Sequence, residues 1–246
     1  MRVRAVVAYD GTDYGGFQSQ ANAPTVQAAL EAALAQVTQE TIAVLAAGRT
    51  DAGVHAVGQT IAFDTAWRHR LGDLQRALNA VLPIDIAILE VEEAAADFHP
   101  RYDARSRHYR YSLYNAPVRW PLGRRHSLHV AASLDLTMME RAARSLVGEH
   151  DFATFGRPPQ NRKRSDITVR RVSMAEWSGE PPWLAFDIEA NAFLYRMVRS
   201  IVGTLLHVGR GRMSLEGFAA ALAACDRSLA GPTAPPHGLC LMEVKY

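Results

Sequence analysis

The chain has 246 residues, of which 48% are hydrophobic and 21% are charged, a composition typical of a globular protein with a sizeable core. It contains no stretch of about 18 apolar residues, which excludes a membrane-spanning helix. Its start, MRVRAVVAYDG, lacks the apolar segment of a signal peptide, so we expect a cytoplasmic protein. The formal net charge is only +2, and the nine histidines have no zinc-type spacing, so we expect no metal.

The first part of the chain alternates between strand and helix patterns. Strands are predicted over residues 3–9, 42–45, 59–63 and 84–91, and helices over residues 26–37 and 71–81. Thr25 is expected to cap the first helix. The resulting order, β-α-β-β-α-β, is that of a split, ferredoxin-like fold.

The second part begins near Arg105 and roughly repeats this order. Strands are predicted over residues 106–115, 167–177, 183–190 and 238–246, and helices over residues 134–148, 191–209 and 214–225. We therefore expect an α+β protein of two ferredoxin-like (RRM-like) halves, residues 1–103 and 104–246. Their antiparallel sheets are expected to join and to leave an active-site cleft between the halves.

The glycine-rich stretches do not predict a nucleotide cofactor. YDGTDYGGFQ follows a strand, but it lacks both the G-x-G-x-x-G spacing and the Gly-Lys-Ser/Thr of a P-loop. GRGR, at residues 209–212, follows a helix instead of opening one. These glycines are better explained by backbone conformation and close approach.

Basic residues are unevenly distributed along the chain. Seven arginines and a single acid lie between Arg101 and Arg125, and a second basic cluster spans Arg157 to Arg171. This asymmetry indicates an anionic partner, with nucleic acid the leading candidate, although a solvated basic surface explains the charge about equally well. The residues expected to contact phosphate are Arg105, Arg107, Arg110, Arg162 and Arg164.

The stretch AAGRTDAGVHAVGQ, residues 46–59, places one acid, Asp51, in a small and turn-forming setting. The simpler interpretation is a turn in which Gly53 supplies a positive φ, and most such stretches are only turns. The alternative is a catalytic carboxylate presented on a tight loop, with Arg49 to handle an anionic substrate.

The predicted strand 106–115 and the predicted helix 191–209 carry further candidates. Arg107, Tyr109, Tyr111 and Leu113 share one face of the strand, where arginine and tyrosine could hold phosphates and stack a base. Cross-strand packing alone explains most tyrosine-rich strands. On the helix, Arg199 lies at the edge of a wide apolar arc and needs an acceptor, either a carboxylate or water.

Seven motifs, in order from end to end, resemble those of the tRNA pseudouridine synthase A (TruA) family. They are YDGTDYGGFQ, TVQAALEAAL, GRTDAGVHAVGQ, FHPRYDARSRHYRY, GEHDFATF, NAFLYRMVRSIVGTLLHVGRG and GPTAPPHGLCLMEVKY. The chain departs from the family pattern at Phe17, where many members have tryptophan, and at Asp103-Ala104. Its segment Arg157–Asp166 does not align clearly.

The resemblance implies conversion of uridine to pseudouridine at positions 38–40 of the tRNA anticodon stem-loop, by a homodimer with no cofactor and no metal. It also implies a role for four residues. Asp51 is the catalytic aspartate, Arg49 acts on the flipped nucleotide, Tyr109 stacks on the target base, and Arg199 pairs with the aspartate.

Two other classes of function remain open from the residues alone. A non-catalytic, RRM-like RNA-binding module would explain the sheet and the arginines, but not the lone acid, and the RRM consensus aromatics are absent. A glycoside- or nucleoside-cleaving enzyme would need a second carboxylate beside Asp51, and none stands out.

Overall fold

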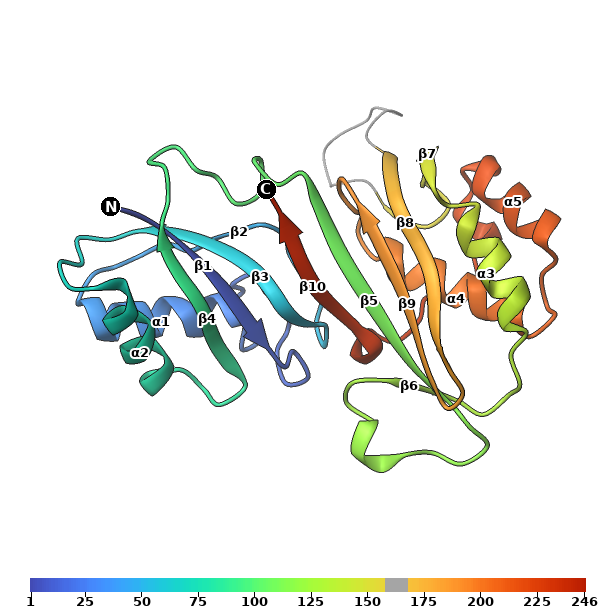
Figure 1. Cartoon of the computed structure of the whole chain (residues 1–246), viewed down its shortest axis with the longest axis horizontal. Helices are drawn as coiled ribbons and strands as arrows, with labels where there is room; N and C mark the ends of the chain where they lie inside the picture. Colours follow the sequence, from blue (N-terminus) through green and yellow to red (C-terminus); the bar gives the residue numbers. More distant parts are fainter. Residues whose placement is uncertain (158–167) are drawn as a thin grey trace. The chain divides into compact units, whose positions relative to one another are not determined.

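The computed structural model describes residues 1–157 and 168–246, which form two compact units (Figure 1). The first unit comprises Met1–Arg105 together with Cys240–Tyr246, and the second comprises Ser106–Leu239. The first boundary lies two residues beyond the one expected between residues 103 and 104. The terminal strand, expected in the second half, belongs instead to the first unit.

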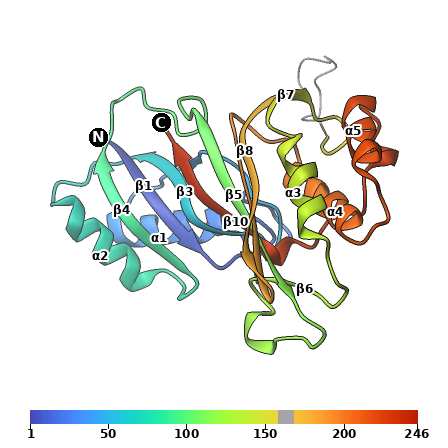
Figure 2. The same ribbon diagram turned by 45° about the vertical axis from the view of Figure 1, so that its right-hand side comes forward.

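The first unit combines a sheet with two helices; in Figures 1 and 2 one helix, α1, passes behind the sheet and the other, α2, lies beside β4. Strand β1 pairs antiparallel with both β3 and β4, β2 pairs antiparallel with β3, and β10 pairs parallel with β3. Alternate residues of β1 are buried, as are Leu30 and Leu34 of α1 and Leu74 and Leu78 of α2, and together they form the core. The elements are β1 (Arg2–Tyr9), α1 (Val26–Thr38), β2 (Leu45–Ala46), β3 (His55–Asp64), α2 (Leu71–Val81), β4 (Ile86–Glu93) and β10 (Leu239–Lys245).

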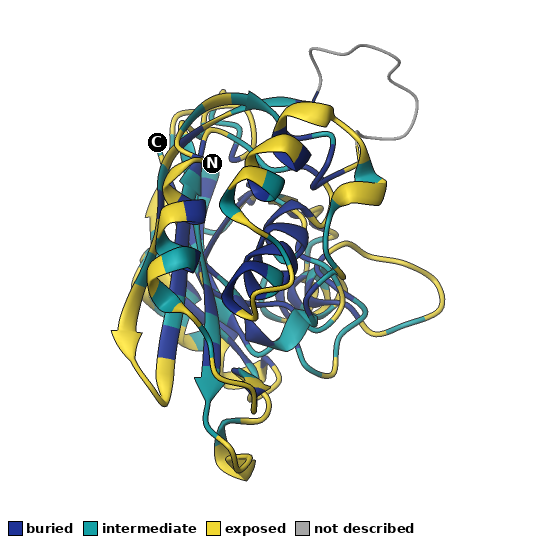
Figure 3. Ribbon diagram, turned by 90° about the vertical axis from the view of Figure 1, so that its right-hand side faces the viewer, coloured by how far each residue is buried: buried dark blue, intermediate teal, exposed yellow. Residues whose placement is uncertain are grey.

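The second unit contains a sheet in the order β6-β5-β9-β8-β7, antiparallel except for the β5–β6 pair. Its central helix, α4, is almost entirely buried (Figure 3). The elements are β5 (Ser106–Asn115), β6 (Leu128–Val130), α3 (Leu136–Arg144), β7 (Gly148–Asp151), β8 (Val169–Glu180), β9 (Trp183–Ala190), α4 (Met197–Gly209) and α5 (Leu215–Ala224), with short 3₁₀ turns at Pro121–Gly123, Arg227–Leu229 and Pro236–Gly238.

Several predicted elements have the predicted bounds, among them the helix over residues 71–81 and the strands over 106–115 and 183–190. The predicted cap of α1 is also confirmed, because the Thr25 side chain accepts a hydrogen bond from the Ala28 N–H. The strand predicted over residues 42–45 is wrong except at Leu45. The Val44 N–H donates to the Glu31 carboxylate, 3.0 Å away, instead of to a neighbouring strand.

The helix predicted over residues 191–209 begins only at Met197. Its preceding residue, Arg196, has a φ of 60°, which ends any helical continuation toward the N-terminus. Tertiary contacts explain the extended segment before it. Leu194 packs against Gly156 so closely that a Cβ on that glycine would lie 2.3 Å from the Leu194 Cβ, and Tyr195 forms an isolated bridge with Arg157.

Strand β10 joins the first unit through several bonds that the order of elements did not predict. It pairs in parallel with the start of β3, Cys240 opposite His55. The Tyr246 ring lies 5.1 Å from that of Phe98, and its hydroxyl donates to the Pro100 carbonyl at 2.8 Å. These contacts join the C-terminal strand β10 to the N-terminal part of the chain.

Within the described ranges, no helix is both long and apolar enough to cross a bilayer.

Candidate functional site

Asp51 lies in the turn between β2 and β3 of the first unit. The Val54 N–H donates to the Asp51 carbonyl at 3.1 Å, and Gly53 has a φ of 75°, so the predicted turn and its positive φ are confirmed. The Gly53 N–H also donates to the Tyr14 carbonyl at 3.3 Å. Asp51 itself is half-buried.

A second loop, residues 10–17, holds the backbone on the N-terminal side of Asp51. The Thr50 carbonyl accepts the Phe17 N–H at 3.1 Å, and the Thr50 hydroxyl lies 2.8 Å from the Tyr9 hydroxyl. Burial raises the pKa of Tyr9, which therefore stays a neutral phenol. Gly16, with a φ of 108°, approaches so closely that a Cβ there would lie 2.8 Å from the Thr50 oxygen. The turn thus has little freedom to shift.

Arg49 also lies in this turn, separated from Asp51 by the buried Thr50. It is exposed, which is the setting expected of a residue that meets a substrate from solvent. The structure therefore places Arg49 and Asp51 in one unit and one loop, as the sequence predicts.

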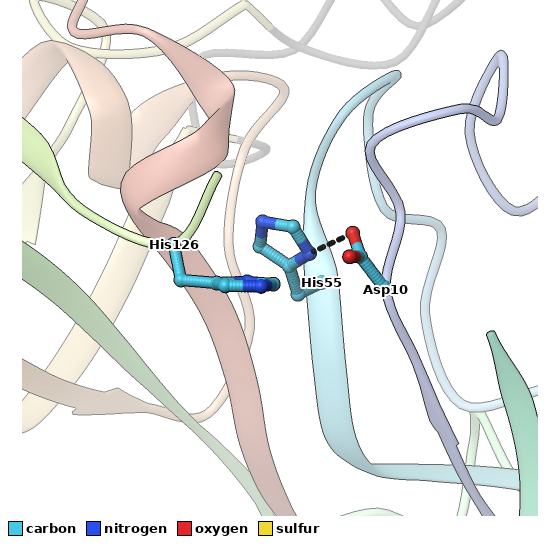
Figure 4. A group of neighbouring side chains, drawn as sticks. All are labelled: Asp10, His55 and His126. Carbon is cyan, nitrogen blue, oxygen red and sulfur yellow. Dashed lines mark ion pairs between the residues drawn. The ribbon is translucent and has the colours of Figure 1, made fainter. Parts of the chain in front are cut away.

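Beside the turn, His55 and Asp10 connect the start of β3 to the end of β1 (Figure 4). The His55 ring is buried, and its Nδ1 lies 3.0 Å from the Asp10 carboxylate and 3.0 Å from the Gly11 nitrogen. When Nδ1 accepts the Gly11 N–H it cannot also donate to Asp10, so the two contacts are alternatives for this nitrogen on the loop that begins at residue 10. His126, also drawn in Figure 4, belongs to the second unit.

Tyr109 lies on β5 of the second unit, half-buried, with its ring edge-on to that of Phe193 at 5.1 Å and 88°. Tyr111 and Leu113, predicted on the same face of the strand, are fully buried. The Tyr111 hydroxyl donates to the Pro235 carbonyl at 2.8 Å. The predicted alternation is therefore confirmed from Tyr111 to Tyr114, whereas residues 106–110 are all half-buried, and the packing interpretation holds for the C-terminal part of this face.

Arg199 lies in the first turn of α4 and is half-buried, as its place on the helix margin predicts. Its Nε donates to the Ala234 carbonyl at 2.8 Å, and the Ala234 N–H returns a bond to the Arg199 carbonyl at 2.9 Å. Burial raises the pKa of Tyr111 and the positive charge of Arg199 opposes that shift, so Arg199 lies near β5. Tyr109 and Arg199 are thus parts of one unit, held by a strand and a helix of the same core.

Arg110 has a structural partner that the sequence does not reveal. Its Nε and Nη2 bind the buried carboxylate of Asp187 on β9 at 3.0–3.2 Å, and His108 Nε2 lies 2.7 Å from the same group. Arg110 was expected to contact RNA, and this bidentate pair gives it a role in the sheet. The sequence could have revealed this ion pair only through the register of the two strands, which sets Arg110 opposite Asp187.

The other arginines expected to contact phosphate have different surroundings. Arg107 Nη1 donates to the Asn191 carbonyl at 2.8 Å. Arg105 is exposed at the end of the first unit, with its N–H bound to the Lys245 carbonyl. Arg162 and Arg164 lie outside the described residues.

Comparison with known proteins gives consistent matches over most of the chain. A family model described as tRNA pseudouridine synthase matches residues 5–103 and 142–246. The chain is 49% identical over 246 residues to the tRNA pseudouridine synthase A of Chloroflexus aurantiacus, which covers 99% of this chain and 88% of that protein. It is 47% identical over 249 residues to that of Moorella thermoacetica, which covers 99% of both chains. The protein of the same name in Brevibacillus brevis is 46% identical over 245 residues and covers 100% of this chain and 99% of its own.

Proposed function

This chain belongs to the tRNA pseudouridine synthase family, and we propose that it acts at positions 38–40 of the anticodon stem-loop with Asp51 as its catalytic carboxylate. The chain is an isomerase that converts uridine to pseudouridine in tRNA. The non-catalytic, RRM-like module and the nucleoside-cleaving enzyme are therefore not retained. The observation that carries the assignment of Asp51 is its position in a tight, glycine-bordered turn of the first unit.

The reaction explains why one carboxylate would be presented in this way. The C1′–N1 bond of the uridine breaks, the uracil turns, and a new bond forms between C1′ and C5, with loss of the proton on C5. A carboxylate can act as the nucleophile or as a base at the sugar. Because the target base must leave its stack, a small turn such as residues 48–54 can approach the nucleotide closely.

Three further residues complete the proposed machinery. Tyr109 presents its ring to the freed uracil, and its hydroxyl is the group proposed to remove the C5 proton. Arg199 pairs with the Asp51 carboxylate, and Arg49 acts on the flipped nucleotide. Asp51 and Arg49 belong to the first unit, whereas Tyr109 and Arg199 belong to the second, so the proposal requires both units to act on one substrate.

The proposal extends to the architecture and the setting of the enzyme. We propose two ferredoxin-like halves with the active-site cleft between them, and the β-α-β-β-α-β order of the first unit supports this. We also propose that the enzyme works as a cytoplasmic homodimer that needs no cofactor or metal. Phosphate contacts are assigned to Arg105, Arg107 and Arg110, and to Arg162 and Arg164, which lie outside the described residues.

The test of Asp51 is incubation of unmodified tRNA with purified protein, without cofactors, followed by measurement of pseudouridine. We expect Asp51→Asn to abolish turnover while preserving the fold and tRNA binding, because asparagine tolerates the same turn. Asp64→Asn is the matched control, since Asp64 is an exposed aspartate of the first unit paired with Arg2 at 2.8 Å. Activity of Asp51→Asn within tenfold of the unaltered enzyme would rule out the assignment.

Tyr109 and Arg199 are tested in combination with Asp51. Tyr109→Phe should retain tRNA binding but stall the reaction after the glycosidic bond breaks, and Arg199→Lys should lower activity because lysine lacks the planar fork of arginine. Residues that act as one unit give strongly non-additive losses in double variants. Additive losses, each mainly in binding, would show that these residues only hold RNA.

A further inference from the structure

Three arginines from distant parts of the second unit converge beside the start of α4. We call Arg157, Arg196 and Arg227 the arginine cluster. The Arg157 N–H donates to the Tyr195 carbonyl at 3.4 Å, and the Arg196 guanidinium lies 4.9 Å from the centroid of the Tyr195 ring. Burial lowers the pKa of Arg227, and the charges of Arg157 and Arg196 lower it further, as expected for neighbours in space.

Arg227 is held in place by neutral acceptors. Its Nη1 donates to the Thr154 carbonyl at 3.3 Å, and its Nη2 donates to the hydroxyls of Ser200 at 2.8 Å and Thr233 at 3.3 Å. A guanidinium has five N–H groups, so at least two remain for another acceptor. These bonds orient the Arg227 guanidinium, but because the acceptors are uncharged they do not cancel its positive charge.

Within the part of the chain that the structure describes, no carboxylate forms an ion pair with any arginine of the cluster. Arginines elsewhere in the same unit do have such partners. Arg144 lies 2.8 Å from Glu140, and Arg171 lies 3.1 Å from Glu149. Three like charges without a counter-ion among the described residues repel one another, and this repulsion is relieved when an anion binds.

Arg196 is also poorly suited to its backbone position. Its φ of 60° is left-handed, a conformation that favours glycine or asparagine over arginine. It is the N-cap of α4, where its side chain makes no capping bond and its charge opposes the helix dipole. A bound anion would offset the unfavourable charge, which gives a physical reason for arginine at this point.

The arginine cluster lies next to Arg199, the residue proposed to pair with Asp51. Arg199 precedes Ser200, which binds Arg227, and its Nε binds the carbonyl of Ala234, the residue after Thr233. We propose that the arginine cluster binds a phosphodiester group of the tRNA backbone next to the target nucleotide. This inference rests on the proposed function and gives that site a substrate contact. Arginine is well suited to the role, because its planar fork matches the oxygens of a phosphate.

The test is the salt dependence of binding, with an unmodified tRNA transcript as the probe. Arg157→Gln, Arg196→Gln and the double variant are compared with Arg144→Gln, which removes a paired arginine of the same unit. For each phosphate that a variant no longer neutralises, the slope of log K against log salt concentration should become less steep by about 0.7–0.9. Arg227 stays unchanged in these variants, because it also bonds to three residues of the core.

Two further measurements separate charge from folding. Arg196→Lys keeps the charge and should keep the slope, so an equal loss with lysine would overturn the inference. At low salt and without RNA, the double variant should unfold at the same temperature as the unaltered protein or higher, because repulsion has been removed. A lower unfolding temperature would mean that the cluster is already compensated within the protein, which also overturns the inference.

The outcomes also distinguish this inference from the proposed function. Pseudouridine formation by the unaltered protein tests the function alone. If pseudouridine forms and the double variant binds tRNA with the affinity and slope of Arg144→Gln, the phosphate site is refuted while the function stands. If the unaltered protein forms none in any tRNA offered, the proposed function fails first.

Discussion

Replacing Gly16 with alanine should displace the turn that carries Asp51. A Cβ at Gly16 would lie 2.8 Å from the Thr50 oxygen, where ordinary contact begins at 3.4 Å, so one side must move by about 0.6 Å. The φ of 108° is strained for any side chain, which adds roughly 1–2 kcal/mol to the loss of stability. Since a misplacement of about 1 Å costs on the order of a hundredfold in rate, we expect a tenfold to hundredfold fall in kcat.

The assay is pseudouridine formation under single-turnover conditions, at a temperature where thermal unfolding shows the variant to be folded. Gly48→Ala is the matched control, because it lies in the turn that carries Asp51 and a Cβ there meets nothing within 4 Å. It should keep both activity and stability. If Gly16→Ala were as active as Gly48→Ala, the position of the turn would not depend on the loop behind it, and the geometric reasoning would be refuted.

Three other perturbations test the two units separately. Gly72 lies in α2, and a Cβ added there meets nothing within 4 Å. Gly72→Ala should therefore raise the free energy of unfolding by about 0.5–1 kcal/mol in a denaturant titration, because alanine has the higher helix propensity. An unchanged free energy of unfolding would contradict this reasoning. Asp187→Asn should lower that free energy by roughly 1–3 kcal/mol, more than Glu149→Gln at an exposed pair, because it leaves the Arg110 guanidinium without its carboxylate at a buried position. Burial, with help from Arg212 and Arg210, lowers the pKa of His207 below 6.5, so the unfolded chain takes up that proton first as the pH falls. Stability from this group is complete above about pH 6.5 and decreases below it, and His207→Gln should make thermal unfolding less dependent on pH in that range.

Most helices and strands could be predicted from the sequence because they depend on interactions between residues close together in the chain. Thr25 caps α1 with its own side chain, and in β5 the buried Tyr111 and Leu113 alternate with the half-buried Ser112 and Tyr114. The turn at Asp51 was predictable for the same reason, since Gly53 supplies the positive φ that the turn needs.

The structure differs from the sequence-based predictions where contacts between residues far apart in the sequence override the local preference for helix or strand. Residues 191–196 have the apolar pattern of a helix, yet Phe193 packs on Tyr109 and Leu194 on Gly156, and those contacts hold the segment extended. The pair of Arg110 with Asp187 joins residues 77 positions apart, which no periodicity reveals. The arginine cluster likewise gathers three segments whose proximity exists only in the fold.

The place of β10 has a consequence for how the chain reaches its native state. The first unit needs this strand beside β3, but the ribosome makes the whole of residues 106–239 before β10 emerges. At usual elongation rates of about 5–20 residues per second, that delay is roughly 7–27 seconds. During that interval the β3 edge that β10 will occupy lacks its final strand, and such an edge can pair with other extended chains. We therefore expect nascent chains that end before residue 239 to be more sensitive to proteolysis in their first hundred residues than the finished protein.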